Sequence, residues 1–243
     1  MGILDDKNFI NQVSIDCVIF GYEDRKIKTL VSKLKHKGDF YSLPSGFVFQ
    51  EEDVESAAER IINERTAITN FYLEQFGVFG KANRRHKAFL DKLIELNYPN
   101  GYDLKIKEPI YDWFTNRFIS IGFYALTDIQ NVRPQLSNID EEIDWYAVDV
   151  VPDLIMDHNE ILTAAYHSLI QNRDVKANAF KLLPSKFTIS EVQEIYEVML
   201  NRAFVRTNFQ KKILEMGVLE RLEKKFTGAK NKAPYLYKLK STI

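Results

Sequence analysis

The sequence predicts an α/β protein: an α/β/α sandwich around a mixed sheet, followed by a small C-terminal domain of winged helix-turn-helix type. First, the strand and helix patterns do not alternate as strictly as in a doubly wound parallel sheet. Second, the C-terminal patterns follow the order helix, turn, helix, strand, basic hairpin, strand. Third, from Lys176 onward the chain has 14 Lys and Arg against 6 Asp and Glu, whereas the preceding part has 19 against 28. An acidic body joined to a basic end indicates two domains with different partners.

Composition restricts the class of protein further. A chain of 243 residues, 45% hydrophobic and 28% charged, can bury a sizeable core, which excludes disordered and low-complexity classes. The single cysteine, Cys17, excludes a disulfide framework and a zinc site built from cysteines. No apolar run approaches the ~18 residues of a membrane span, and the N-terminus is acidic, unlike a signal peptide. We therefore expect a soluble, cytoplasmic protein with no membrane partner.

The body begins with alternating, β-branched segments and then changes to helical spacing. Residues 13–20 and 27–34 predict two strands joined by a turn, and residues 41–48 predict a short extended piece. Residues 54–66 predict a helix, because their apolar positions recur at i, i+3 and i+4. The later patterns predict strands at 71–79, 117–126 and 142–148 and a closing helix at 159–172.

Residues 84–113 form an insertion that is long for a connection inside a domain. Connections of this length are usually lids, binding loops or disordered segments. Within it, residues 86–96 predict a helix that buries Phe89, Leu93 and Leu96. A polar junction near residue 174 divides the chain into two expected domains, 1–174 and 175–243.

The first helix of the second domain has an N-terminal capping pattern. Thr188 with Glu191, or Ser190 with Gln193, would form a capping box ahead of a helix at residues 191–201. Either box would satisfy backbone N–H groups that the helix start leaves free.

A second helix follows at residues 208–216, and the pair Thr207 and Gln210 predicts another capping box before it. Gly217 lies where a glycine stops a helix. Two strands follow, one ending near residue 226 and one at residues 234–239, joined by a basic hairpin. We assign four apolar side chains to the core of this domain: Phe209, Ile213, Leu214 and Leu219.

This order predicts that the second helix enters a DNA major groove with its first turn at the base edges. The residues in or just before that turn offer hydroxyl, amide and ammonium groups for bases and phosphates. Cationic side chains nearby suit phosphates, because they release counterions from the DNA. The candidates are Thr207, Asn208, Gln210 and Lys211 in the first group and Lys212, Lys230 and Lys232 in the second. The alternative is a domain that only packs on the body or dimerises, with solvated lysines.

One segment of the body has a specific spacing: Gly46, five residues, Glu52, seven residues, then Arg60 and the run that ends at Ile68. It resembles the Nudix box over its whole length, with Glu64 also matching. Three positions depart from the family pattern. Ile61 and Arg65 replace glutamates, and Ala67 replaces a glycine.

The departures bear on the chemistry that the resemblance implies. Nudix hydrolases gather Mg²⁺ with carboxylates on one helix face, where the metal activates water and neutralises a pyrophosphate. Positions 61, 64 and 65 lie within about 100° of one another on a helix and form that face. Here they are Ile61, Glu64 and Arg65, so we expect no catalytic residues, no metal and no cofactor. Glu52 and Arg60 remain, and an ion pair between loop and helix would explain both. The alternative is an active Mg²⁺-dependent pyrophosphatase that cleaves a nucleoside diphosphate derivative.

The C-terminal sequence supplies a second resemblance. Residues 180–197, 206–214 and 234–238 are similar to the corresponding parts of Nudix-related transcriptional regulators. The resemblance implies a degenerate Nudix domain that senses a small molecule and a winged helix that binds double-stranded operator DNA. It also implies a homodimer and an effector that is a nucleotide derivative, such as ADP-ribose, or a sugar, such as arabinose.

The remaining candidates are weaker. Four histidines are too scattered for a metal site and are expected at surface or capping positions. Asn83, Arg84 and Arg85 follow a strand and fit either an anionic effector or a solvated basic turn. The four histidines are His36, His86, His158 and His167. Cys17, Trp113 and Trp145 are expected to be packing residues.

Overall fold

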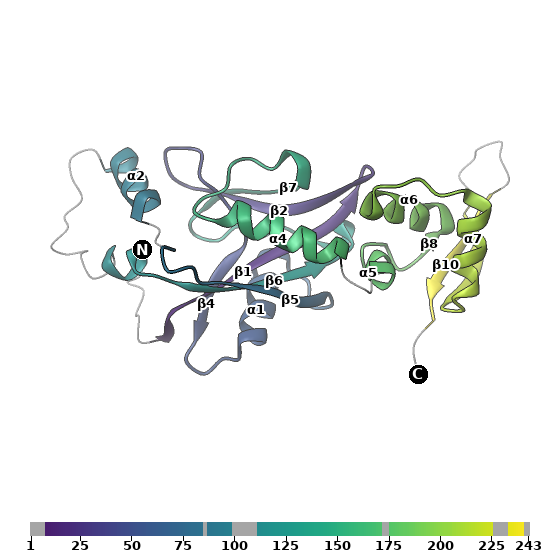
Figure 1. Cartoon of the computed structure of the whole chain (residues 1–243), viewed down its shortest axis with the longest axis horizontal. Coiled ribbons are helices and arrows are strands. Elements are labelled where there is room, and N and C mark those ends of the chain that lie inside the picture. Colours follow the sequence, from purple (N-terminus) through teal and green to yellow (C-terminus); the bar gives the residue numbers. More distant parts are fainter. Residues whose placement is uncertain (1–7, 85–86, 99–110, 172–174, 226–232, 241–243) are drawn as a thin grey trace.

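The computed structural model describes residues 8–84, 87–98, 111–171, 175–225 and 233–240, arranged along one long axis (Figure 1). A large sheet with its helices occupies most of the length, and a small sheet with three helices lies at the C-terminal end. None of the helices formed by these residues has the length and apolarity that a bilayer crossing requires.

The large sheet is mixed, as the sequence predicts. Its strands follow the order β3-β2-β1-β6-β5, with β4 also paired to β1 and β7 also paired to β2. β1 and β6 are parallel, whereas the other pairs are antiparallel. The strands are β1 (Phe9–Glu23), β2 (Lys26–Leu34), β3 (Tyr41–Ser42), β4 (Ser45–Phe49), β5 (Tyr72–Phe79), β6 (Ile119–Leu126) and β7 (Asp140–Ala147).

One long helix covers each face of this sheet (Figure 1). α1 (Val54–Thr66) packs on the face that carries Ile15, Cys17 and Ile19 of β1. α4 (His158–Gln171) packs on the opposite face with Val18 and Phe20. Successive strand residues point to opposite faces, so one apolar strand supplies both cores. The arrangement is the α/β/α sandwich predicted from the sequence, and α1 has the predicted bounds.

Two predictions about the strands were incomplete. The extended piece at 41–48 is two strands, because Leu43 and Pro44 leave the β3 pairing, and Pro44 has no N–H to donate. The Pro44 carbonyl instead accepts the Cys17 N–H at 2.8 Å. β1 begins at Phe9, four residues before its predicted start, and pairs there with Phe49.

The insertion contains the predicted helix, α2 (Lys87–Asn97), but the helix is less buried than expected. Phe89 packs edge-on against Phe40 with ring centroids 5.5 Å apart, whereas Leu96 is exposed. Trp113 brings the end of the insertion against Phe47, at 4.8 Å between ring centroids. These contacts hold the described parts of the insertion on the end of the sheet remote from the C-terminal elements (Figure 1).

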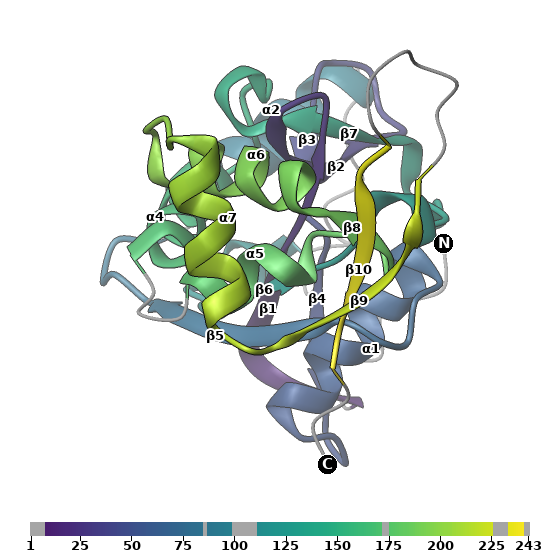
Figure 2. The same cartoon turned by 90° about the vertical axis from the view of Figure 1, so that its right-hand side faces the viewer.

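The C-terminal elements have the predicted order, seen end-on in Figure 2. The small sheet has the strand order β8-β10-β9. The capping box at the start of α6 is the one formed by Thr188 and Glu191, and Gly217 has a φ of +70° just after α7. The elements are α5 (Val175–Lys181), β8 (Phe187–Thr188), α6 (Ile189–Leu200), α7 (Arg206–Glu215), β9 (Leu219–Lys224) and β10 (Tyr235–Leu239).

Two details of α7 differ from the prediction. The helix begins at Arg206 after Val205, so Thr207 lies inside the first turn and forms no capping box with Gln210. Phe209 and Ile213 are buried as expected, but Leu214 is exposed and Leu219 is only half-buried. With the helix starting two residues earlier than predicted, the core-facing stripe consists of positions 209 and 213, one turn apart.

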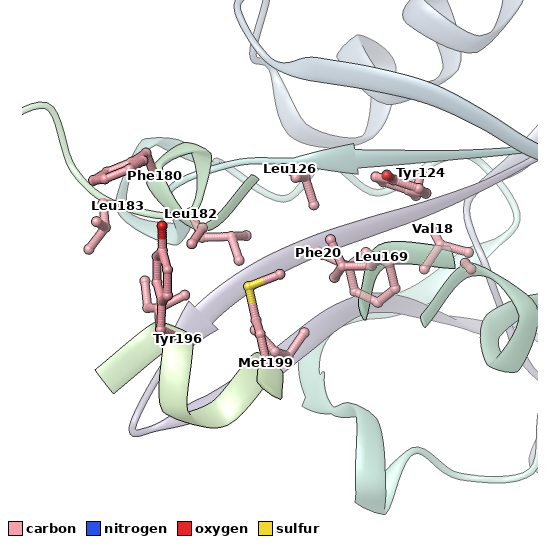
Figure 3. Packing of buried hydrophobic residues seen from close by; sticks show 14 of the residues in the cluster. Val18, Phe20, Tyr124, Leu126, Leu169, Phe180, Leu182, Leu183, Tyr196 and Met199 are labelled. Atoms are coloured by element: carbon pink, nitrogen blue, oxygen red, sulfur yellow. The ribbon is translucent and has the colours of Figure 1, made fainter. Parts of the chain in front are cut away.

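A continuous apolar core joins the two sheets. Figure 3 shows Phe20 and Leu126 of the large sheet beside Leu182 and Met199 of the C-terminal elements. The cluster continues through Tyr196, whose ring lies 5.2 Å from that of Phe209 in α7. The large sheet and the second helix of the helix-turn-helix are therefore connected by packed side chains, which transmit displacement in a close-packed interior.

Candidate functional site

Gly46, the first residue of the Nudix-like segment, packs closely against helix α1. Gly46 lies so close to Ile61 of α1 that an added Cβ would be 2.9 Å from its Cδ1 atom. Ile61 is itself only 2% exposed and belongs to the apolar cluster between α1 and the sheet. A glutamate in this orientation would bury a carboxylate among apolar side chains, at a cost of several kcal/mol unless paired.

The retained pair Glu52 and Arg60 joins the loop to the helix. Arg60 Nε donates to Glu52 Oε1 at 2.7 Å, and Arg60 Nη2 donates to Glu52 Oε2 at 2.9 Å and to the Phe47 carbonyl at 2.8 Å. The Phe49 N–H also donates to Glu52. The Arg60 guanidinium holds the pKa of the Glu52 carboxyl below its usual range. This is the loop-to-helix ion pair that the sequence suggested.

The residue that replaces the last glutamate, Arg65, points into the protein. Its Nη1 donates to Asp140 Oδ2 at the start of β7, and the Asp140 side chain is fully buried. Asp140 also accepts the Ser137 N–H at 2.8 Å and the Ser137 hydroxyl at 2.6 Å. A guanidinium therefore neutralises the carboxylate that lies beneath this end of α1.

The metal-binding face of the Nudix pattern is thereby changed in both charge and direction. Of its three positions, only Glu64 carries a carboxylate, which is 58% exposed and 3.4 Å from Arg60. Within the described ranges, no three His, Cys, Asp or Glu side chains are grouped so that they could hold a metal ion. Mg²⁺ prefers several oxygen ligands, and among these three positions only Glu64 offers one.

A half-open cleft of about 390 Å³ lies on the other face of the sheet, where β5 ends and α4 begins. Its apolar wall includes the exposed side chains of Val78 and Ile119. Its polar wall has two ion pairs that connect the β5 end to α4: Lys81 with Glu160 at 2.8 Å, and Arg84 with Asp157 at 2.6 Å. The first pair is exposed, whereas the Arg84 side chain is buried.

Arg84 continues from the cleft into a buried polar network. Its Nη1 donates to the Phe118 carbonyl at 3.2 Å, and its Nη2 lies 3.7 Å from Asp16 of β1. Asp16 also accepts a hydrogen bond from the Ser120 hydroxyl. Of the two interpretations of this segment, a solvated turn is wrong for Arg84, because it is buried.

His158 belongs to the same network and is buried rather than at the surface. Its Nδ1 accepts the Leu43 N–H at 3.0 Å, and its Nε2 lies 3.5 Å from Asp16. Burial lowers the pKa of this imidazole below its usual range. The ring is therefore neutral near pH 7, and since Nδ1 accepts, the proton is on Nε2 and faces Asp16.

The predicted DNA-contacting residues that the structure describes share one exposed surface on α7. Phe209 and Ile213 are buried, whereas the polar and cationic residues on the rest of the helix surface are exposed to solvent. Two exposed arginines lie near the start of the same helix: Arg202, whose guanidinium is 4.7 Å from the Phe204 ring centre, and Arg206, the first residue of α7. The exposed candidates are Thr207, Asn208, Gln210, Lys211 and Lys212, whereas Lys230 and Lys232 lie outside the described residues.

The fold and this surface can be compared with known proteins. A family model described as the NrtR DNA-binding winged helix domain matches residues 179–239, from the end of α5 to β10. The C-terminal elements therefore form a winged helix domain of the NrtR type. The large mixed sheet has a Nudix-like fold, which precedes the winged helix in the chain.

Relatives match almost the whole chain. The ADPR responsive transcriptional repressor NtrR of Acinetobacter baylyi is 24% identical over 227 residues, covering 91% of this chain and 79% of the relative. The crystal structure of Shewanella oneidensis NrtR with a 27mer DNA has a TM-score of 0.68 at 20% identity, covering 95% and 94% of the two chains. A MutT/nudix family protein from Enterococcus faecalis gives a TM-score of 0.64 at 17% identity, covering 95% of this chain and 87% of that one. Both structures share the fold.

Proposed function

We propose that this protein is a ligand-responsive transcriptional regulator, whose winged helix binds double-stranded operator DNA and whose Nudix-like domain senses an effector. The exposed face of α7, inside a winged helix of the NrtR type, is the observation that carries the proposal. We retain the division into domains 1–174 and 175–243. The regulator acts as a homodimer in the cytoplasm, where its operator lies. A dimer would read two half-sites one helical turn, ~34 Å, or a multiple of it apart.

The first turn of α7 supplies the groups that would read bases. Asn208 is suited to adenine, because its amide can donate to and accept from the major-groove edge of that base. Thr207 and Gln210 offer further hydrogen bonds, and Lys211 and Lys212 approach phosphates. Lys230 and Lys232 of the hairpin would add phosphate contacts. The helix start has no side-chain cap, so its first N–H groups can also face a phosphate.

We expect Asn208→Ala to weaken binding to the operator by about 1–3 kcal/mol per half-site contact, with little change on scrambled duplex. The measurement is fluorescence anisotropy with duplex DNA from the upstream region of the gene and a scrambled duplex. Asn83→Ala, an exposed asparagine of the Nudix-like domain, is the matched control. Equal losses on both duplexes would show that Asn208 does not read sequence.

We infer that the Nudix-like domain has lost phosphohydrolase activity. The inference rests on Ile61 and Arg65, since one is packed in the core and the other is paired to Asp140. Gly46, Glu52 and Arg60 then serve the loop-to-helix contact alone. Mg²⁺-dependent cleavage of a nucleoside diphosphate derivative that Glu64→Gln abolishes would establish the pyrophosphatase instead.

The effector we propose is an anionic nucleotide derivative of the ADP-ribose class, bound in the cleft between β5 and α4. The Acinetobacter relative is named for its response to ADPR. In the cleft, Lys81 and Glu160 form an exposed pair, and because exposed pairs contribute little, an anionic ligand can replace Glu160 beside Lys81 at little cost. Arg84 and Asp157 are more buried and remain together, because breaking such a pair costs about 3–5 kcal/mol.

We expect Lys81→Gln to weaken ADP-ribose binding about tenfold, because the variant lacks the cation that would form a charge-assisted hydrogen bond with the ligand. Glu160→Gln should tighten it up to about fivefold by removing the competing carboxylate. Lys26→Gln, which removes an exposed cation paired to Asp149, is the control. Titration calorimetry measures all three, with arabinose as a neutral comparison ligand. Unchanged affinity in both cleft variants would place the effector elsewhere, and a response to arabinose alone would assign the sugar class.

A further inference from the structure

The turn between α6 and α7 is fixed by one carboxylate, that of Glu197. Its Oε1 accepts the Phe204 N–H and the Gln193 side-chain amide, both at 2.9 Å. Gln193 also donates to the Phe204 carbonyl at 2.9 Å. These hydrogen bonds lower the pKa of the Glu197 carboxyl, so it is ionised at neutral pH. Phe204 precedes α7 by two residues, and Glu197 therefore sets where the DNA-contacting helix begins.

The other oxygen of this carboxylate faces the Nudix-like domain. Arg25, at the tip of the β1–β2 hairpin, places Nη2 3.8 Å from Glu197 Oε2. The Glu197 side chain is 20% exposed and that of Arg25 is 65% exposed. One glutamate thus contacts both the sensing domain and the residue that introduces the reading helix.

The hairpin tip has an unusual backbone for its sequence. Asp24 and Arg25 have φ values of 52° and 61°. They are the two turn residues between Glu23 and Lys26, the last paired residues of β1 and β2. Turns with two left-handed residues favour Asn-Gly or Asp-Gly, because most side chains are strained in that conformation. An arginine is here held in the position where glycine is preferred, with its guanidinium beside Glu197.

In the same hairpin, Tyr22 lies against the shared core and β2 contacts α6. Burial and the nearby Glu194 and Glu197 raise the pKa of the Tyr22 phenol to about 12, so it stays neutral. An apolar contact and a charged contact therefore join the hairpin to the helix-turn-helix.

The hairpin is continuous with the network beneath the cleft. β1 runs without interruption from Asp16, 3.7 Å from Arg84, to Glu23 at the base of the turn. It pairs with β2, β4 and β6, so it is held within the sheet on both sides. The buried network beneath the cleft and the hairpin are therefore connected by a single strand.

We propose that Arg25 is a positioning residue, through which the Nudix-like domain sets the α6–α7 turn and hence the placement of α7. This inference rests on the proposed function, since it assigns the route by which the sensing domain acts on DNA binding. An exposed ion pair contributes about 0–1 kcal/mol, so its removal changes the coupling by up to about fivefold.

The test compares Arg25→Gln with the conservative variant Arg25→Lys and with the control variant Lys26→Gln. Lys26 is the next residue, but its ion-pair partner, Asp149, lies in the Nudix-like domain and not in the helix-turn-helix. Backbone hydrogen exchange over residues 201–209 is measured first, in the full chain without DNA. We expect exchange two- to fivefold faster in Arg25→Gln, wild-type rates in Lys26→Gln and recovery in Arg25→Lys. Equal rates in Arg25→Gln and Lys26→Gln would overturn the proposal.

The second readout is the ratio of DNA affinities without and with ADP-ribose. We expect Arg25→Gln to reduce this ratio two- to fivefold with an unchanged thermal midpoint. A wild-type chain that binds no DNA would refute the proposed function, while hydrogen exchange would still decide whether Arg25 holds the turn. A wild-type ratio in Arg25→Gln, despite faster exchange, would show that the contact is structural only and would also overturn the proposal.

Discussion

Replacement of Arg65 by methionine should lower the free energy of unfolding by about 3–5 kcal/mol. The change removes the cation from a buried pair and leaves the Asp140 carboxylate buried with only its hydrogen bonds from Ser137. Methionine retains much of the buried aliphatic volume, so the loss is chiefly electrostatic. Urea denaturation followed by circular dichroism measures the change, with the m-value checked for constancy.

Two further variants separate this explanation from simple loss of packing. Arg65→Met combined with Asp140→Asn should recover part of the loss, because the amide oxygen still accepts from Ser137 but carries no charge. Glu64→Gln, on the exposed face of the same helix, should stay within about 0.5 kcal/mol of wild type. A cost below 1 kcal/mol for Arg65→Met would mean that the pair is not needed to hold α1 and β7 together.

The Arg65 contact shows what a local sequence pattern can and cannot predict. The spacing of the box identified Arg65 as a departure, because it stands where the family pattern has a glutamate. Its partner, Asp140, is 75 residues away and has no motif of its own. Helix periodicity gives the direction of a side chain, but the identity of its neighbour depends on how the sheet is assembled.

The same reasoning explains which elements were predicted well. α1 was predicted at its observed bounds, because its apolar spacing and its packing on the sheet agree. The start of α7 was wrong, because Thr207 and Gln210 fit a capping pattern while the apolar Val205 occupies the cap position. Propensity is a weak guide at a helix start when the preceding turn is fixed by other contacts, here those of Glu197.

The network beneath the cleft could not be found from sequence. Asp16, Arg84, Asp157 and His158 come from separate parts of the chain, and Asp16 lies within an apolar strand pattern. Buried charges are tolerated only when paired, so an isolated Asp in a buried strand is itself a signal for a distant cation. That signal predicts that a partner exists, but it does not say which one.

On the DNA side, we expect the double variant Lys211→Gln and Lys212→Gln to reduce operator affinity at least tenfold near physiological salt. The two lysines are exposed on α7, and the Lys211 pair with Glu215 is a weak exposed one at 3.9 Å. If each lysine neutralises one phosphate, it releases a counterion from the DNA when the protein binds. A variant without the lysine leaves that counterion on the DNA. The slope of log K against log salt should then fall by about 2 per protomer, on both operator and scrambled duplex.

A control with the same change in net charge distinguishes phosphate contacts from the general field of the protein. Lys33→Gln with Lys87→Gln removes two cations from the Nudix-like domain, and Lys87 lies on α2 at the end remote from α7 (Figure 1). This control should leave the slope within about half a unit of wild type, because its charges lie beyond a Debye length of ~8–10 Å from the duplex. Equal slopes for the two double variants would mean that long-range attraction dominates and that α7 does not lie against the phosphates. A reduced slope only for the α7 variant, together with a sequence-selective loss in Asn208→Ala, would assign positioning to the lysines and reading to the asparagine.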